Sequence, residues 1–431
     1  MNFFCNKYLI LVLSFFQPMI LNVGGEISPT FLFILFTSPF WMQQLKFRQD
    51  RLLKYFVVLF VLLILVQILW IPFAHTGLFI QLKGIMVTVS GLIYFLYFYL
   101  VTRKNRDVVK WITLGIFLSS FVFVNVLAEM EGGEFGLWKF QIMPRLVSAV
   151  VLIYLWLSEY HWMQKLAPLL FIGVGLLGVA TGARSAGLVP LMAGLLVLLL
   201  RVQKNIRFVS VKKYLVIGLI VLYGIYAFIY VPNVLNGTIY GGNTGQLKKV
   251  DNPYNPINLL MIGRTDAIIP FIAFGDKPIT GWGYNTSDPH LYYRTLMMRM
   301  ASDDEKKQLR LGIGHYYTIP GHSVWGYYAC SYGVIAFILI LLLIAKVWRC
   351  VYISLRRKDK YLLYRSYLIF MFSWNILFSP MAHFKTLPMY VAIMLVLSTI
   401  SYYGKSISIK KSILNMKKEG NKWYTIRRMN D

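Results

Sequence analysis

The sequence PGHSVWGYYACSYG (residues 320–333) ends the longest polar segment of the chain and begins an apolar helix. The polar segment, residues 232–320, also contains GRTDAIIPFIAFGDKPITGWGYNTS (residues 263–287). Apolar runs dominate the chain on both sides of it. A loop of this length usually carries function, because a rigid scaffold displays its chemistry there. We therefore expect the rest of the protein to hold this loop on one side of a bilayer.

The composition predicts an all-α integral membrane protein. The chain has 431 residues, 58% of them hydrophobic, and a mean hydropathy of +0.59. Its apolar runs approach the roughly 20 residues that cross a hydrocarbon core, and they predict about twelve transmembrane helices. Residues 1–231 hold the first nine and residues 321–404 the last three, with an extracytoplasmic loop with short helices at 232–320 and a basic cytoplasmic tail at 405–431.

Positive charge follows the predicted topology. The net charge is +27, which in a soluble protein would indicate a nucleic-acid partner. Here the segments predicted to be cytoplasmic carry 30 of the 44 Lys and Arg and 6 of the 17 acids, which makes +24 inside and +3 outside. Basic clusters fall on alternate connections, at residues 46–54, 103–110, 201–213 and 356–365. This asymmetry is the positive-inside rule, so we expect membrane lipids and no nucleic acid as partners.

Arg184 is an isolated cation between two predicted helices. It lies in GARSAG (residues 182–187), whose small residues permit a close approach of two backbones. An ionisable residue at membrane depth is costly and is by default a functional candidate. Its long side chain can also extend to the interface without any other role. Both interpretations remain open from the sequence.

Three other polar or aromatic features lie outside the loop. Glu129, Glu131 and Glu134 could bind a divalent metal or act as a base, but a solvated turn is the simpler interpretation. His75, in a short external turn, is more often just solvated than functional. The aromatic run at residues 94–99 is interpreted as an interfacial belt.

Within the loop, residues 259–273 predict a short helix that is stopped by Gly275 and Pro278. Arg264 and Asp266 lie near its start. Trp282 and Tyr284 follow in a glycine-rich turn and present aromatic faces, which commonly contact sugar rings.

His322 stands where the helix after the loop begins. The positive end of the helix dipole favours a neutral imidazole, which can accept a proton. A histidine that only caps the helix or lies at the interface is the alternative.

Three segments together resemble the O-antigen ligase/polymerase superfamily of bacterial envelope glycosyltransferases. GARSAG (residues 182–187) is similar to the family's small Gly-Ser-Arg-Gly turn. GR at residues 263–264 and DKPITGWG at 276–283 resemble its Gly-Arg…Pro-x-x-Gly-x-Gly stretch. HS at 322–323 ahead of YGVI at 332–335 resembles its helix entry after a histidine. The order of the segments and the large late external loop also match.

This resemblance implies a GT-C-like fold and a reaction on the outer side of the bacterial inner membrane. A glycan would pass from an undecaprenyl diphosphate carrier to an acceptor hydroxyl, without nucleotide sugar, cofactor or required metal, and a chain-length regulator protein would be a further partner. The resemblance implies that Arg184 and Arg264 bind the diphosphate, since arginine meets phosphate oxygens bidentately. His322 would be the base, and Asp266, Trp282 and Tyr284 would contact substrate.

Three functions fit these sequence features. A polymerase would join lipid-linked repeat units of O-antigen, capsule or exopolysaccharide, and a ligase would move a finished glycan by the same chemistry. A polysaccharide flippase or other transporter would perform no chemistry at all. Transporters tend to show internal repeats and polar sites near the bilayer midplane. The chain shows no internal repeat and gathers its polar residues in one loop, which favours a transferase.

Overall fold

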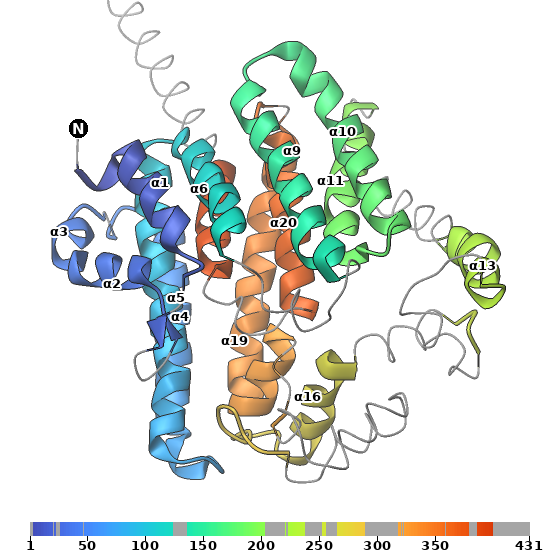
Figure 1. Cartoon of the computed structure of the whole chain (residues 1–431). Coiled ribbons are helices and arrows are strands. Elements are labelled where there is room, and N and C mark those ends of the chain that lie inside the picture. The colour runs from blue at the N-terminus through green and yellow to red at the C-terminus, as the bar shows by residue number, and fades with distance from the viewer. Residues whose placement is uncertain are drawn as a thin grey trace, which may run out of the picture.

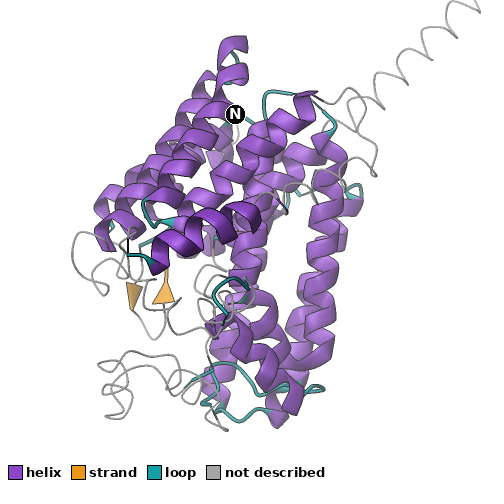
Figure 2. Ribbon diagram, turned by 90° about the vertical axis from the view of Figure 1, so that its right-hand side faces the viewer, coloured by secondary structure: helices purple, strands orange, loops and turns teal. Residues whose placement is uncertain are grey.

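A computed structural model of the chain describes residues 3–19, 21–22, 26–45, 47–123, 136–202, 220, 223–237, 252–255, 265–288, 318–319, 321, 323–357, 359–378 and 386–399. Within these residues the fold is helical, apart from the two-residue strands β1 (Leu21–Asn22) and β2 (Glu26–Ile27), which pair antiparallel at one side of the molecule (Figure 2). The predicted all-α class is confirmed for this part of the chain.

Five helices are long and apolar enough to cross a membrane: α4 (Arg51–Leu69), α5 (Leu78–Lys104), the continuous segment Trp138–Leu157 made of η3 (Trp138–Ile142) and α9 (Met143–Leu157), α10 (His161–Ala180) and α19 (Val324–Leu355). This indicates a membrane protein, and the count of twelve spans stays a prediction. The other described helices are η1 (Phe3–Cys5), α1 (Lys7–Phe16), α2 (Pro29–Phe36), α3 (Ser38–Met42), η2 (Ile71–Phe73), α6 (Val108–Val122), α11 (Arg184–Val202), η4 (Ile225–Tyr230), α13 (Val231–Leu235), α16 (Thr265–Asp276), α20 (Leu362–Phe378) and Leu387–Thr399.

The helices pack as an elongated bundle (Figure 1). The α10–α11 hairpin lies against α20, α1 packs on α6, α4 packs on α5 and α19, and α16 packs on α19. Side-chain caps fix where several helices begin. Asn6 caps α1, Ser28 caps α2, Asp50 caps α4 and Ser323 caps α19, each by accepting a hydrogen bond from a backbone N–H of the first turn.

The outer face of α4 shows what surrounds the bundle. Its exposed side chains include Val58, Val61, Leu62, Leu65 and Ile68. An apolar stripe of this length would be an aggregation surface in water, whereas it is the expected face of a helix in lipid.

Three connections meet at one end of the bundle, which we call the basic end. Lys110 Nζ lies 3.6 Å from Asp107 and 3.8 Å from Glu159, and Lys360 Nζ lies 3.6 Å from Asp107 and pairs with Glu159. Asp107, Glu159 and Lys360 belong to the α5–α6, α9–α10 and α19–α20 connections and Lys110 to the first turn of α6; these connections lie at the top of Figure 1. All three are connections that the sequence places in the cytoplasm, so the structure brings them to a common end.

Arg365 lies buried at the same end. Its guanidinium donates to Asp359 at 2.8 Å and to the carbonyl oxygens of Ser354, Leu397 and Arg357 at 3.3 to 3.4 Å. The side chain is fully enclosed. It therefore ties the end of α19 to α20 and to helix Leu387–Thr399, so this member of the predicted basic cluster 356–365 has a structural role.

The aromatic run at residues 94–99 corrects a sequence interpretation. All of its rings are buried, at 2% exposure or less, so it is not an interfacial belt. Tyr94 shares a 2.6 Å hydrogen bond with Ser28, Tyr97 donates to Phe4 O, and Tyr99 donates to Asp50 at 2.6 Å. The belt interpretation was wrong because α5 is surrounded by other helices at this level, and periodicity alone does not show which helix is central.

Candidate functional site

The end of the molecule opposite the basic end is organised by a break in α19. At Gly333 the backbone leaves the helix, with φ 73° and ψ −170°, a region open essentially to glycine alone. A Cβ at this position would lie 1.9 Å from the carbonyl oxygen of Ile279. A break of this kind leaves backbone N–H and C=O groups without their helical partners, which is costly in or near a membrane.

A loop segment supplies the missing partners. We call residues 277–288 the docked segment. The N–H groups of Trp282 and Gly283 donate to Cys330 O at 2.8 Å and Ser331 O at 2.9 Å, and Val334 N–H donates to Pro278 O at 2.7 Å. The docked segment thus provides hydrogen-bond partners for three backbone groups of α19, on both sides of Gly333.

The α4–α5 connection holds the docked segment from its other side. His75 N–H donates to Trp282 O at 3.0 Å, and Lys277 Nζ donates to Phe73 O at 2.7 Å. Tyr284 N–H donates to the buried Gln81 side chain at 3.1 Å. The docked segment therefore bridges α5 and α19, elements about 240 residues apart along the chain, as the Thr88–Tyr328 pair also records.

The position of the break matches a membrane boundary. The part of α19 after Gly333 is about 33 Å long at 1.5 Å per residue, close to the roughly 30 Å of a hydrocarbon core. Every exposed large hydrophobic residue of α19 lies after Gly333: Val334, Ile335, Ile338, Leu341, Leu342, Trp348 and Ile353. Residues 324–332 are buried in protein, except the half-buried Trp325. An apolar layer that covers this exposed part of α19 would therefore end near Gly333 and the docked segment.

A buried polar network lies beneath the docked segment. Gln67 donates to Thr88 at 2.8 Å, and Thr88 shares a 2.9 Å hydrogen bond with Tyr328. The hydroxyl of Tyr327 accepts from Asn285 N–H at 2.7 Å. Polar side chains of this kind join helices in a membrane, so this network fixes α4, α5 and the first part of α19 to one another.

Two predicted substrate-binding residues lie in the docked segment. Trp282 is only 7% exposed, and its indole N–H donates to Ala273 O at 2.7 Å. Tyr284 is half-buried and packs edge-to-face on Tyr327, with ring centroids 5.9 Å apart. Both side chains therefore anchor the segment, and their contact with a sugar stays a prediction.

The other predicted site residues are not placed. Arg264 and His322 lie outside the described residues, as do the external carboxylates at 129–134 and the basic tail. Asp266 lies in the first turn of α16 and Arg184 begins α11, but the structure does not describe either side chain. The predicted proximity of Arg184, Arg264 and His322 therefore stays a prediction.

The small residues around Arg184 do have a structural explanation. A Cβ at Gly187 would lie 2.5 Å from Gly175 O and 2.9 Å from the carbonyl carbon of Gly178. The α10–α11 hairpin can close this tightly only because these positions are glycine. The similarity of GARSAG to the family's turn thus coincides with a packing requirement.

The comparisons with known proteins add no relative. No family model and no curated protein matches this chain. The resemblance to the O-antigen ligase/polymerase superfamily consequently rests on the three short segments of the sequence alone. Two of those segments, at 276–283 and 332–335, are joined by the hydrogen bond from Val334 N–H to Pro278 O, and Trp282 and Gly283 of the first donate to Cys330 and Ser331 just before the second.

Sequence reasoning missed the break in α19 and the pairing of the docked segment with it. The residues 321–347 read as one continuous span, because a glycine inside an apolar run is common. The signal that could have revealed the break was the repeated Gly281 and Gly283, whose φ values of 71° and 99° allow the loop backbone to approach the helix closely.

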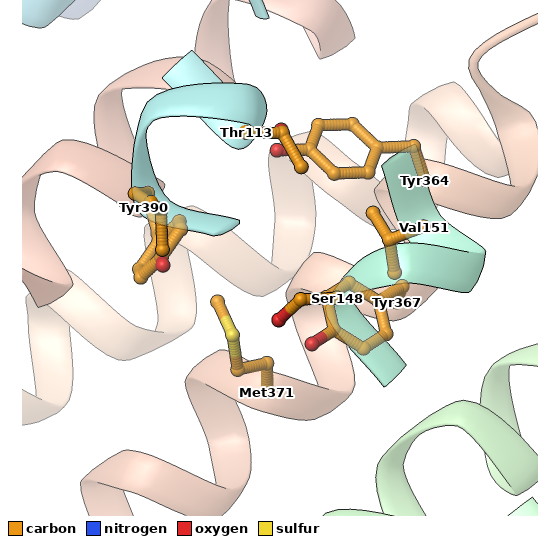
Figure 3. A pocket seen from close by; sticks show the side chains of 8 residues that line it. Thr113, Ser148, Val151, Tyr364, Tyr367, Met371 and Tyr390 are labelled. Carbon is orange, nitrogen blue, oxygen red and sulfur yellow. The ribbon is translucent and has the colours of Figure 1, made fainter. Parts of the chain in front are cut away.

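A small cavity lies between α6, α9, α20 and helix Leu387–Thr399 (Figure 3). Its lining includes the hydroxyl-bearing residues Thr113, Ser148, Tyr364, Tyr367 and Tyr390. The cavity has a volume of about 40 Å³. A single water molecule needs about 10–15 Å³. The cavity can therefore hold a few waters but not a sugar ring. Within the described residues no group of three or more His, Cys, Asp or Glu side chains could hold a metal ion.

Proposed function

We propose that the protein is a membrane glycosyltransferase that polymerises undecaprenyl-diphosphate-linked repeat units of O-antigen, capsule or exopolysaccharide. Its reaction would take place at the extracytoplasmic face of a bacterial inner membrane. The observation that carries the proposal is the docking of residues 277–288 on the break in α19. Two segments that resemble the superfamily, 276–283 and 332–335, are separate in sequence, yet Val334 N–H of one donates to Pro278 O of the other, and Trp282 and Gly283 donate to the adjacent Cys330 and Ser331. Segments that form one structural unit are the expected basis of a shared site.

The level of this unit supports the same reaction. A polyprenyl chain keeps its diphosphate at the surface of the hydrocarbon core. The exposed apolar part of α19 begins after Gly333, so a bilayer that covers that part would put the docked segment at the depth of such a headgroup. A transferase acting on a lipid diphosphate needs its binding groups at this boundary.

The chemistry assigns one role to each predicted residue. The acceptor hydroxyl oxygen forms a bond with the anomeric carbon of the donor glycan, while the bond from that carbon to the diphosphate oxygen breaks. Arg184 and Arg264 would stabilise the negative charge that grows on the leaving diphosphate. His322 would accept the hydroxyl proton. Asp266, Trp282 and Tyr284 would contact the glycan.

A ligase of the same superfamily is the nearest alternative, because it would use the same residues. A transporter is the alternative from another class, and a broken helix is a feature of many transporters. In those proteins the freed backbone groups face the substrate, whereas here the docked segment occupies Cys330 O, Ser331 O and Val334 N–H. The transferase is therefore the better supported proposal.

The products of a deletion strain distinguish the three functions. A polymerase null makes one repeat unit, flips it and attaches it singly to the final acceptor, so long chains vanish and a single-unit product remains. A ligase null accumulates long polymer on the lipid carrier. A flippase null leaves single units on the cytoplasmic side.

We expect the single-unit product, both in the deletion strain and with a stably inserted His322→Ala protein. Long carrier-linked polymer in the null would replace the polymerase with the ligase. Chains of normal length from His322→Ala would remove His322 as the base and leave the polymerase proposal standing.

A further inference from the structure

Two basic side chains lie on one indole ring at the loop-facing end of the bundle. The His75 ring centroid is 5.0 Å from that of Trp282, with the planes 42° apart. Lys277 Nζ is 5.6 Å from the centroid of the same ring. His75 belongs to the α4–α5 connection and the other two belong to the docked segment, so only the fold brings them together.

Backbone hydrogen bonds hold these groups in place. His75 N–H donates to Trp282 O at 3.0 Å, Lys277 Nζ donates to Phe73 O at 2.7 Å, and the Trp282 indole donates to Ala273 O at 2.7 Å. A lysine ammonium has three donors and a histidine ring has two nitrogens. Within the described residues the imidazole makes no hydrogen bond, and Lys277 uses one donor. Polar groups therefore remain for a ligand, on a position that the backbone fixes.

His75 and Lys277 are both basic, and neither is neutralised by a neighbouring carboxylate of the described residues. Within the described part of the chain neither His75 nor Lys277 forms an ion pair with a carboxylate. Asp276 precedes Lys277 and is exposed, Asp288 is buried near Cys330, and Lys83 lies over Phe79. Burial and the charge of Lys277 both lower the pKa of His75, and burial lowers that of Lys277. Both shifts record a cost that a bound anion would relieve.

We propose that His75 and Lys277, both beside the Trp282 ring, form a binding site for a phosphate group at the membrane boundary. Phosphates are concentrated at this level, because the headgroup region occupies about 5–7 Å on each side of the hydrocarbon core. The phosphate could belong to a phospholipid headgroup or to a diphosphate that is not part of a bilayer lipid. The site does not depend on the proposed glycosyl transfer, since a headgroup would occupy it in a membrane protein of any function.

The test follows the titration of His75 in the purified full-length protein. The protein is kept in a maltoside detergent, which contains no phosphate, and its six histidines are labelled with ¹⁵N. The His75 signal is assigned by its loss in His75→Gln. Inorganic pyrophosphate is added in one arm, and phosphatidylglycerol is mixed into the micelles in the other. An anion favours the imidazolium, so the pKa of His75 should rise by about one unit or more.

The two arms separate the sources of phosphate. A rise with pyrophosphate alone assigns the site to a diphosphate, a rise with phosphatidylglycerol alone assigns it to a headgroup, and a rise with both supports a site that accepts either. No rise in either arm overturns the proposal. Binding should weaken as the pH rises through the pKa of His75, because the neutral imidazole no longer attracts the anion.

Variants of Lys277 and Lys83 control the experiment. Lys277→Gln should raise the pKa of His75 in the absence of phosphate, because a like charge is removed, and should abolish most of the response to the probe. Lys277→Arg keeps the charge and should keep the rise in the pKa of His75 on adding the probe. If the glutamine variant does not fold, loss of this rise in Lys277→Arg would contradict the proposal. Lys83→Gln, on the neighbouring α5, should change neither the pKa of His75 without phosphate nor the rise of that pKa when the probe is added. A full response in a folded Lys277→Gln protein would remove Lys277 from the site.

Discussion

The two ends of the bundle hold their connections together by different interactions. At the basic end, Asp107, Lys110, Glu159 and Lys360 form ion pairs among three connections, and Arg365 binds Asp359. At the opposite end, the docked segment is held by backbone hydrogen bonds on α19 and on the α4–α5 connection.

The basic side chains of the two ends also differ in whether they are paired with carboxylates. Those of the basic end that form this cluster are already paired with carboxylates, whereas His75 and Lys277 have no such partner in the described residues. The charges of the basic end thus stabilise contacts between connections, whereas His75 and Lys277 at the opposite end remain available to a ligand. This contrast is what the following predictions test.

The largest effect is an all-or-none difference in labelling between the ends. Gly77→Cys, in the exposed α4–α5 connection, should react with an impermeant thiol reagent in whole cells once the reagent can reach the inner membrane. Asn105→Cys, in the α5–α6 connection of the basic end, should not. The native Cys5 and Cys330 are buried and Cys350 is half-buried, which keeps the background low. Labelling of Asn105→Cys with Gly77→Cys silent would reverse the topology.

The buried arginine should matter most to stability. Arg365→Met leaves Asp359 and several carbonyl oxygens without their donor, and breaking a buried pair costs about 3–5 kcal/mol. Because the Asp359 side chain is 34% exposed, we expect the lower part of that range. Unfolding of the purified protein in detergent measures it. The exposed Arg356→Met is the matched control and should stay within about 0.5 kcal/mol of wild type.

If Arg365→Met were as stable as wild type, the buried hydrogen bonds of Arg365 would add no net stability to the basic end. The distinction between paired and available charge would then rest on the loop-facing end alone.

The proposed phosphate-binding arginines should affect transfer and not stability. Arg184→Ala and Arg264→Ala should each lower glycan transfer by about 10²- to 10³-fold, the usual loss of a preorganised donor. Lysine at either position should restore only part of the activity, because it lacks the planar fork. Arg356→Ala at the basic end is the control for losing an arginine. Wild-type chain synthesis by either alanine variant, at normal protein level, would exclude that arginine from the site.

The break in α19 can be tested with one methyl group. Gly333→Ala places a Cβ against Ile279 O and forces an unfavourable backbone conformation, which costs about 1–3 kcal/mol. We expect lower thermal stability together with loss of the docked segment's protection from hydrogen exchange. Gly173→Ala is the control, since no atom lies within 4 Å of its added Cβ. Unchanged exchange in Gly333→Ala would show that the docked segment does not need the break.

The smallest effect should come from the exposed ion pairs of the basic end. Burial alone would raise the pKa of Asp107, but the charges of Lys360 and Lys110 hold it below its ordinary value of 3.8. Its stabilising contribution is therefore fully present above pH 3.8 and is lost as the pH falls below that value through the folded pKa. Asp107→Asn should cost less than about 1 kcal/mol at neutral pH and flatten this acid dependence. A larger loss would mean that the cluster is coupled more tightly than exposed pairs usually are.

Much of the helical framework was predictable from the sequence, because hydropathy, charge and capping residues act locally. The apolar runs predict the five long helices, and Asn6, Ser28 and Asp50 stand where helices begin. The short helix predicted at 259–273 corresponds to α16, displaced by a few residues. The alternation of basic connections also predicts which turns share an end, since each apolar run must cross the same layer.

The sequence could not show which side chains meet across the bundle. It presented residues 94–99 as an interfacial belt and placed Arg365 in a basic cytoplasmic cluster, yet the side chains of both are buried because other helices surround them. It presented Trp282 as an open aromatic face, yet His75, some two hundred residues away along the chain, covers it. Such contacts depend on how helices pack, and no local pattern records them.

What the sequence determined by itself is therefore the class of the protein, the membrane-type helices and the separation of charge between two ends. Only the tertiary structure decided that α19 breaks at Gly333, that residues 277–288 complete its hydrogen bonds, and that His75 and Lys277 share one indole ring. The physical reason is the range of the interactions. Hydropathy and charge are properties of single segments, whereas a helix break is stable only when a distant segment satisfies the backbone groups that it leaves open.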